Sequence, residues 1–243
     1  MPRFFVPSDG FNENTVRISG DDAFHIARSL RMAVGDEITV CDMHSNEHTC
    51  RLTKIRDEEC ECEILTTMAG KTEPPIYITL YMGYPKGDKL ETVIQKAVEL
   101  GASKIVPFES SRCIKRPKAD RAEKQLQRFS RIAEEAAKQC GRSKLPEVSQ
   151  TLSFKDMLVE ARGADAALFC YEGDGTTSLR EVLKDKEYKS LSVIVGSEGG
   201  FSLEEAALAA EFGCISVNLG PRILRCETAP AYVLSALSYE FEL

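Results

Sequence analysis

Hydrophobic and polar positions follow two different patterns along the chain, and the change falls near residue 72. Short runs rich in β-branched and aromatic residues predict strands at 3–6, 15–19, 37–42, 49–55 and 61–68, with one helix over 22–32. Glycines and acidic turn residues separate these runs. We interpret residues 1–72 as a small β-barrel domain with one helix, a common architecture for RNA-binding accessory domains.

A domain boundary is predicted at residues 71–75, KTEPP, because consecutive prolines extend the backbone and remove two amide donors. Beyond it, strands and helices alternate. Strands are predicted at 76–82, 104–108, 166–170, 191–195 and 215–219, and helices at 88–100, 120–140, 178–184, 203–212 and from Thr228 onward. This alternation predicts an α/β domain with a parallel sheet over residues 73–243.

Two loops follow predicted strands at their carboxyl ends, where open α/β sheets place their ligands. The first, residues 196–202, reads GSEGGFS, and Ser202 with Glu205 has the spacing of a capping box for the next helix. Its glycines let the backbone approach a ligand closely. The loop is neither GxGxxG nor a P-loop, so it does not indicate a dinucleotide or a triphosphate. A plain strand-to-helix turn is the alternative interpretation.

The second loop, residues 219–229, reads LGPRILRCETA. A Gly-Pro turn, two arginines, an acidic residue and a helix start can hold an adenine-like ligand on backbone amides while an arginine reaches an oxygen-rich partner. An ordinary connection with solvated charges is the alternative.

Positive charge gathers in the middle of the chain, although the formal net charge is −7. Between Arg112 and Lys144, eleven basic residues meet four acidic ones. The basic residues are Arg112, Lys115, Arg116, Lys118, Arg121, Lys124, Arg128, Arg131, Lys138, Arg142 and Lys144. Such a segment can form an electrostatic footprint for RNA, but charge alone favours a solvated helix face.

The nine cysteines are odd in number and form no CxxC pair, which favours reduced, mostly buried thiols. Cys41, His44, His48 and Cys50 lie close in sequence, but their spacing matches no standard zinc pattern, and residues 42–48 read as a polar turn between strands. No metal site is expected. Because no apolar run reaches about 20 residues and the amino terminus lacks a signal-peptide pattern, we expect no membrane association and a cytoplasmic location.

Both loops together resemble the paired signature of the RsmE family, the 16S ribosomal RNA uridine-N3 methyltransferases of the SPOUT superfamily. The resemblance extends over nearly the whole chain, in order, through RFFV, HIARSLRMAVGDEI, KGDKLETVIQKAVELGASKIVP and RIAEEAAKQCGRSKLP. Ser197 stands where the family often has proline, which bears on loop rigidity, and Cys140 where it often has serine.

The resemblance implies a PUA-like RNA-binding domain followed by a SPOUT catalytic domain with a deep trefoil knot, and a homodimer in which the neighbouring subunit completes each active site. It also implies S-adenosylmethionine as the cofactor. The implied cofactor-binding residues are Gly196, Glu198, Gly199, Gly200, Leu219, Gly220, Ile223, Leu224, Arg225, Thr228 and Ala229.

Three residues are candidates for catalysis. Deprotonated uridine N3 spreads negative charge onto two carbonyl oxygens, which a guanidinium such as that of Arg225 would stabilise. Glu198 or Glu227 could accept the proton, although each could instead cap backbone amides or pair with an arginine.

Contacts with RNA are expected from the basic segment and from two other places. Glu135, Gln139 and Arg142 recur on one face of the long helix's end and resemble target-base and RNA contacts, or else form an exposed helix terminus. Arg28, Arg31, Lys86 and Lys89 are expected to contact phosphates. The expected partner is therefore 16S rRNA in the small ribosomal subunit. A SPOUT enzyme acting on transfer RNA or another ribosomal position, and a non-catalytic RNA-binding assembly protein, remain alternatives.

Overall fold

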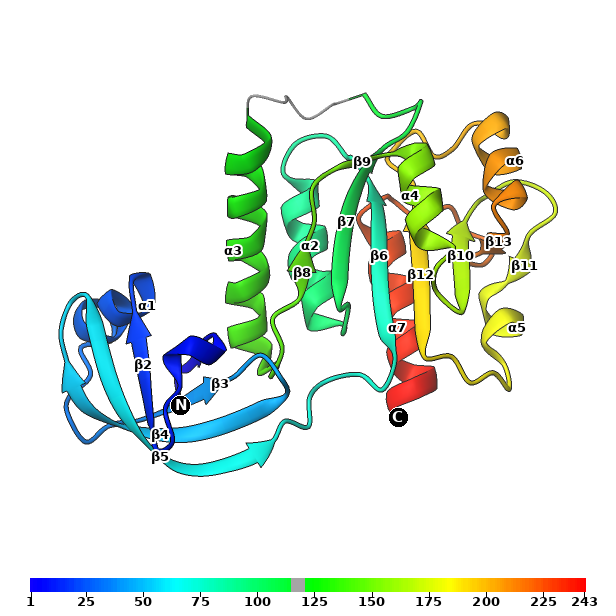
Figure 1. Ribbon diagram of the computed structural model, residues 1–243. Coiled ribbons are helices and arrows are strands. Elements are labelled where there is room, and N and C mark those ends of the chain that lie inside the picture. Colours follow the sequence, from blue (N-terminus) through cyan, green and yellow to red (C-terminus); the bar gives the residue numbers. More distant parts are fainter. Residues whose placement is uncertain (115–120) are drawn as a thin grey trace. The chain divides into compact units, whose positions relative to one another are not determined.

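The computed structural model describes residues 1–114 and 121–243 and divides into two compact units. The first unit consists of Met1–Glu73 and Ala137–Leu145, and the second of Pro74–Ala136 and Pro146–Leu243 (Figure 1). The predicted helix start at Asp120, and the basic residues Lys115, Arg116 and Lys118, lie outside the described residues.

The first unit is built on a five-stranded sheet of order β1-β3-β4-β5-β2. Its strands are β1 (Arg3–Phe5), β2 (Thr15–Ser19), β3 (Glu37–Cys41), β4 (Asn46–Ile55) and β5 (Glu59–Ala69). Only the β1–β3 pair is parallel. Among the described strands, the hydrogen-bonded order runs from β1 to β2, and these two edge strands do not pair with each other. Strand pairing therefore does not close the predicted barrel.

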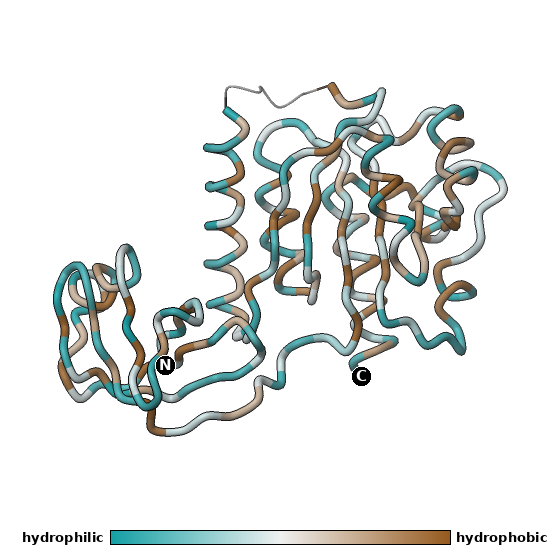
Figure 2. Tube along the Cα trace, in the orientation of Figure 1, coloured by the Kyte–Doolittle hydropathy of each residue, from teal (hydrophilic) through white to brown (hydrophobic). Residues whose placement is uncertain are grey.

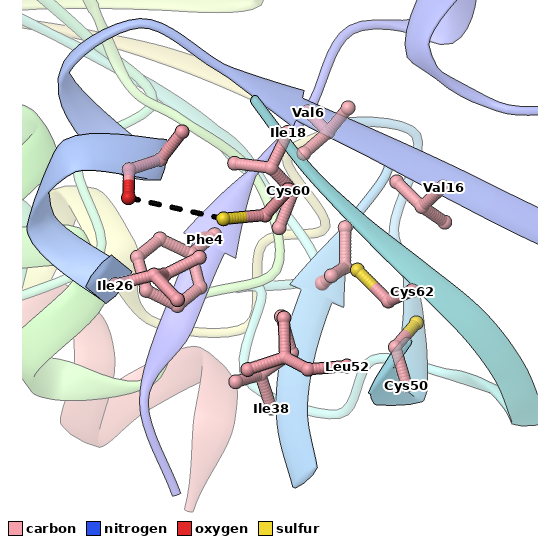
Figure 3. Close-up of a cluster of buried hydrophobic side chains, with 12 residues drawn as sticks. Phe4, Val6, Val16, Ile18, Ile26, Ile38, Cys50, Leu52, Cys60 and Cys62 are labelled. Atoms are coloured by element: carbon pink, nitrogen blue, oxygen red, sulfur yellow. Dashed lines mark hydrogen bonds between the residues drawn. The ribbon is translucent and has the colours of Figure 1, made fainter. Parts of the chain in front are cut away.

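Alternating side chains of these strands form the core of the first unit (Figure 3). The pattern TVRIS buries Val16 and Ile18 and exposes Thr15, Arg17 and Ser19. Three cysteines, Cys50, Cys60 and Cys62, are buried in the same core. Burial raises the pKa of the Cys50 and Cys62 thiols to about 12, which keeps both thiols neutral at physiological pH, as expected of reduced structural cysteines.

The helical segment of this unit differs from the prediction, because only part of it is an α-helix. The predicted helix over 22–32 consists of α1 (Asp21–Phe24) and a π-helical turn η2 (His25–Ser29). A short 3₁₀ turn, η1 (Ser8–Gly10), precedes β2. Between β3 and β4, the Asp42 carboxylate accepts hydrogen bonds from the amides of His44 and Asn46 at 2.8 and 3.0 Å, which confirms a turn. The turn is shorter than predicted, because residues 46–48 already belong to β4. Within residues 1–114 and 121–243 no group of three potential metal ligands gathers.

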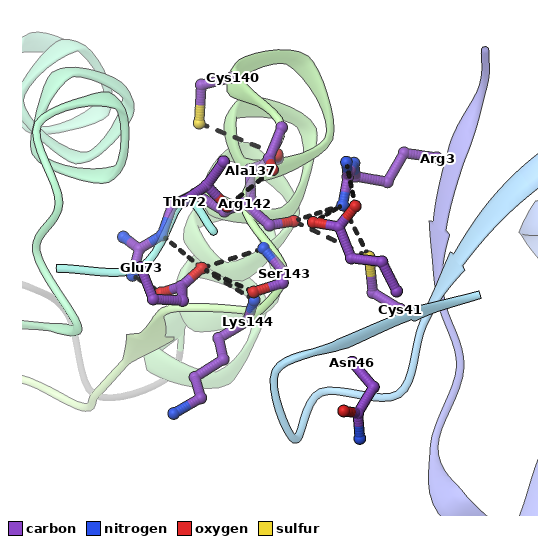
Figure 4. A network of polar contacts seen from close by, with 12 residues as sticks. Arg3, Cys41, Asn46, Thr72, Glu73, Ala137, Cys140, Arg142, Ser143 and Lys144 are labelled. Carbon is purple, nitrogen blue, oxygen red and sulfur yellow. Dashed lines mark hydrogen bonds and ion pairs between the residues drawn. The ribbon is translucent and has the colours of Figure 1, made fainter. Parts of the chain in front are cut away.

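Within the first unit, a network of polar contacts joins Glu73 to residues 142–144 (Figure 4). The Glu73 carboxylate accepts from Arg142 Nη2 at 2.6 Å and from the amides of Ser143 and Lys144 at 2.9 and 3.0 Å. Burial by itself raises the pKa of Glu73, but the Arg142 guanidinium and these amides lower it overall. The ion pair therefore stabilises the unit in the ionised state.

The second unit is built on a parallel sheet of order β11-β13-β10-β12-β6-β7-β8, with β9 also paired to β7. The strands are β6 (Tyr77–Gly83), β7 (Lys104–Glu109), β8 (Glu147–Val148), β9 (Leu152–Ser153), β10 (Ala166–Cys170), β11 (Thr177–Ser178), β12 (Ser190–Val195) and β13 (Ile215–Asn218). Each described pairing in this sheet is parallel, which confirms the α/β prediction.

Helices lie on both faces of the sheet (Figure 1). The central strands are mostly hydrophobic, whereas α3 carries many hydrophilic residues (Figure 2). The helices are α2 (Lys89–Glu99), α3 (Ala122–Cys140), α4 (Phe154–Ala161), α5 (Leu179–Leu183), α6 (Leu203–Glu211) and α7 (Thr228–Glu242). The end of α3, from Ala137 onward, belongs to the first unit. Tyr81 and Phe169 pack with Met157 and Leu158 of α4 in one core cluster, whereas α7 packs against α2 and β12. Helix α4 was not predicted. Of the helices in the described part of the chain, none has the length and apolar character to cross a bilayer.

Candidate cofactor and active site

A cavity of about 540 Å³ opens at the carboxyl ends of β10, β12 and β13, three adjacent strands of the second unit. Both loops singled out in the sequence line it, together with the segment after β10 and the first residue of α2. Its volume lies within the range of small-molecule and cofactor sites. The strand order therefore brings together two loops that are separated by α6 and β13 in the chain (Figure 1).

The loop after β12 is a tight turn that hydrogen bonds within the loop and at the start of α6 stabilise. The Gly200 amide donates to the Ser197 carbonyl at 3.0 Å, and Gly200 has φ +61°, a conformation that favours glycine. At the start of α6 the capping box is present, with Glu205 N–Ser202 Oγ at 3.2 Å and Ser202 N–Glu205 Oε2 at 2.9 Å. The buried Glu205 also accepts the Ser111 amide at 2.7 Å. These contacts fix the loop that forms one wall of the cavity.

A close backbone approach supports the same wall from β6. A Cβ added at Gly83 would lie 2.5 Å from the Ser197 amide nitrogen and 2.9 Å from the Gly196 carbonyl carbon. Only glycine fits there without a backbone shift. The end of β6 therefore sets the position of the first loop.

The loop after β13 also lines the cavity. The carbonyl of Arg225 accepts the amides of Thr228 and Ala229 at 2.8 and 2.9 Å and so satisfies donors at the start of α7. The side chains of Arg225 and Ile223 are exposed, and both residues line the cavity. The arrangement offers an apolar surface and a guanidinium next to backbone groups.

Lys89 lies between acidic side chains of the two loops. Its ammonium is 3.1 Å from Glu198 Oε1 and 3.1 Å from Glu227 Oε2. Partial burial by itself raises the pKa of Glu198, but hydrogen bonds from its own amide, from Lys89 and from the Lys86 amide lower it overall. Hydrogen bonds from its own amide and from the Cys226 thiol, followed by that from Lys89, lower the pKa of Glu227. Both carboxylates are therefore held ionised.

The cavity contains most of the cofactor-binding residues expected from the sequence. It is lined by Gly196, Glu198, Gly200, Leu219, Gly220, Ile223, Leu224, Arg225 and Ala229. Gly199 and Thr228 do not line it. A Cβ at Gly199 would instead meet Arg112 Cβ at 2.9 Å and the Arg112 carbonyl oxygen at 3.0 Å, so this glycine serves the packing of the loop against the segment after β7.

Several lining residues were not singled out as cofactor contacts. They are Lys89, Cys170, Tyr171, Glu172, Val195, Ser197, Phe201, Asn218, Pro221, Arg222 and Cys226. Tyr171 and Glu172 directly follow β10, so the rule that ligands bind at the carboxyl ends of parallel strands could have indicated them.

The residues expected to contact RNA differ in their surroundings. Arg31, Lys86 and Gln139 are exposed. Arg28 is exposed but forms a bidentate pair with Asp57, with Nε–Oδ1 at 2.9 Å. Glu135 is exposed and pairs with Arg131 at 3.1 Å.

Arg142 is only 4% exposed, and its guanidinium pairs with Glu73. This burial gives Arg142 a structural role in the first unit. The alternative interpretation, an exposed helix terminus, therefore does not hold for Arg142.

Comparison with known families agrees with this architecture. An RNA methyltransferase domain matches residues 72–238, and an RNA methyltransferase PUA domain matches residues 18–65. The fold and site thus define an RNA methyltransferase with an amino-terminal PUA domain. The chain is 36% identical over 234 residues to ribosomal RNA small subunit methyltransferase E of Bacillus subtilis (strain 168), covering 94% of this chain and 91% of that protein. It belongs to the ribosomal RNA small subunit methyltransferase E family.

Solved structures agree with this membership. The ribosomal RNA small subunit methyltransferase E from Neisseria gonorrhoeae, bound to S-adenosyl methionine, is 33% identical with a TM-score of 0.86, covering 98% of this chain and 97% of that one. A Legionella pneumophila methyltransferase in complex with the cofactor SAM is 28% identical with a TM-score of 0.86, covering 98% of this chain and 96% of that one.

Proposed function

We propose that this chain transfers the methyl group of S-adenosylmethionine to N3 of one uridine in 16S ribosomal RNA. Membership of the family supports the reaction and the substrate class. The observation that carries the proposal is the cavity of about 540 Å³, in which the two loops that resemble the family signature face each other.

The residues of the cavity fit this cofactor. Glycines at 196, 200 and 220 expose backbone groups for an adenine ring, and Leu219 and Leu224 add apolar contact. The carboxylates of Glu172 and Glu198, which could pair with a cationic ligand, line the cavity beside the cations of Lys89, Arg222 and Arg225. When bound, S-adenosylmethionine supplies an electrophilic methyl group on a cationic sulfur.

Arg225 is the proposed catalytic residue. Its exposed guanidinium at the cavity can stabilise negative charge on the uridine carbonyl oxygens as N3 loses its proton. Glu198 and Glu227 are the candidate proton acceptors. Their lowered pKa values and their pairing with Lys89 make them weak bases, so we assign them first to holding the cavity's shape.

We propose that residues 1–72 bind RNA and that residues 73–243 bind the cofactor, except that Glu73 and Ala137–Leu145 belong to the first unit. We propose that the second domain carries a trefoil knot and forms a homodimer that completes each active site. Apolar exposure supports an interface, since Ile223 is 88% and Tyr239 72% exposed. Because its proposed substrate is ribosomal RNA, the protein would act in the cytoplasm.

The proposed RNA contacts are surface residues of both units. Arg31, Lys86 and Gln139 are exposed, and Arg28 and Glu135 can exchange their present partners for RNA. Phosphate contacts by Arg28, Arg31 and Lys86 would position the substrate and would not select a sequence.

A methyl-transfer assay tests the proposal. Wild-type protein is incubated with methyl-labelled S-adenosylmethionine and, separately, with small ribosomal subunits lacking the modification, naked 16S rRNA and transfer RNA. We expect label in 16S rRNA and recovery of N3-methyluridine after digestion. Label in transfer RNA alone would identify another target, and binding of RNA without transfer would indicate an assembly protein.

A further inference from the structure

Lys89, which lines the cavity, contacts both of its loops. It is the first residue of α2, whereas Glu198 follows β12 and Glu227 precedes α7. Besides the two carboxylates at 3.1 Å, its ammonium lies 3.8 Å from Cys226 Sγ. Three segments far apart in the sequence therefore converge on one nitrogen.

The three charged side chains are each partly covered by the protein. The side chains of Lys89, Glu198 and Glu227 are 34%, 28% and 26% exposed, so each is partly shielded from water. Without the ammonium, two ionised carboxylates would face each other at the cavity with no compensating charge, and like charges repel. The Lys86 amide, which donates to Glu198 at 3.2 and 3.3 Å, ties the first loop to the same end of α2.

An ammonium engaged by two carboxylates is poorly placed to take up a phosphate as well. The position of Lys89 therefore differs from that of Lys86, whose exposed side chain is open to solvent. The expectation of a phosphate contact fits Lys86 better than Lys89.

We infer that Lys89 is a positioning residue for the cofactor: by pairing with Glu198 and Glu227 it holds the two loops at the spacing that the cofactor requires. The inference rests on the proposed function, because it concerns the same cavity. It assigns Lys89 to cofactor binding rather than to RNA binding.

The test is equilibrium binding of S-adenosylmethionine to the full chain by calorimetry, without RNA. Lys89→Met should weaken binding by about tenfold, and Lys89→Arg should retain most of the affinity because it keeps the charge. Lys96→Met is the matched control, since Lys96 lies on the same helix and its ammonium is 2.8 Å from Glu99 Oε2. Neither Lys96 nor Glu99 lines the cavity. It should bind as the wild type does.

A double-mutant cycle distinguishes the positioning role of Lys89 from a direct contact between Lys89 and the cofactor. In a Glu198→Gln, Glu227→Gln background, the charges that Lys89 holds are absent, so Lys89→Met should have no further effect. The same loss in both backgrounds would show that Lys89 contacts the cofactor directly and would overturn the inference. Thermal unfolding of each variant checks that it is folded.

Two further results would also decide the matter. If the wild type binds the cofactor and Lys89→Met binds it equally well, the positioning role of Lys89 is refuted while the proposed function stands. If the wild type itself does not bind S-adenosylmethionine, the proposed function fails. The salt dependence of RNA affinity should be unchanged in Lys89→Met. A smaller salt dependence would indicate that Lys89 contacts a phosphate.

Discussion

Gly83→Ala perturbs the contact between β6 and the first loop by a single methyl group. The added Cβ would lie 2.5 Å from the Ser197 nitrogen, about 0.9 Å closer than the 3.4 Å at which ordinary contact begins. The next neighbours, the Gly196 carbonyl carbon and Cα at 2.9 and 3.2 Å, are also backbone atoms, so no side chain can rotate away. The loop must move.

The expected cost is that of overpacking, about 1–3 kcal/mol, offset by roughly 0.4–1 kcal/mol because alanine restricts the unfolded chain. We therefore expect the free energy of unfolding to fall by about 1–2 kcal/mol. The displaced wall should also weaken cofactor binding by about tenfold, which corresponds to roughly 1.4 kcal/mol.

Denaturant unfolding and calorimetric titration with S-adenosylmethionine measure the two effects. Gly163→Ala is a suitable control, since it has the same effect on the unfolded chain, and its nearest contact, the Glu160 carbonyl oxygen at 3.2 Å, lies outside the cavity. If Gly83→Ala binds the cofactor as tightly as the wild type does, the close approach of β6 does not set the cavity wall.

Four other predictions concern single residues. Arg225→Ala should abolish methyl transfer while the protein remains folded, and a wild-type rate would remove Arg225 from the mechanism. Because the pKa of Glu73 lies below its ordinary value of 4.5 in the folded state, its ion pair contributes fully above pH 4.5 and is lost as pH falls through the folded pKa; Glu73→Gln should flatten this dependence in acid denaturation. Lys86→Met should reduce the slope of log affinity for RNA against log salt by about 0.7–0.9, and an unchanged slope would exclude a phosphate contact. Ser202→Ala should lower the free energy of unfolding by about 1 kcal/mol through loss of the α6 cap, and an unchanged midpoint in urea would contradict that role.

Local signals in the sequence predicted the elements that position the site. The β-branched run at 191–195 and the Ser202–Glu205 spacing gave β12 and the start of α6 with nearly correct bounds, because each depends on residues close in sequence. Helix α4 was missed, and the short strands β8, β9 and β11 carry two residues each, too few to show a period.

Long-range partners could not be predicted. Helical spacing placed Arg142 near Gln139 and Glu135, but nothing local showed that Glu73, 69 residues away, would bury its guanidinium. In the same way, the motif around Lys89 gave a basic residue at a helix start, whereas its role depends on carboxylates 109 and 138 residues further along the chain. Such assignments need the sheet order, which decides which strand ends meet.

The most direct test of the account is a crystal structure of the protein with S-adenosylmethionine. We expect the cofactor between residues 196–201 and 219–226, with backbone groups of both loops at its adenine ring and Arg225 near its methyl group. A complex in which the cofactor lies elsewhere, with the cavity at the ends of β10, β12 and β13 open to water, would contradict the account.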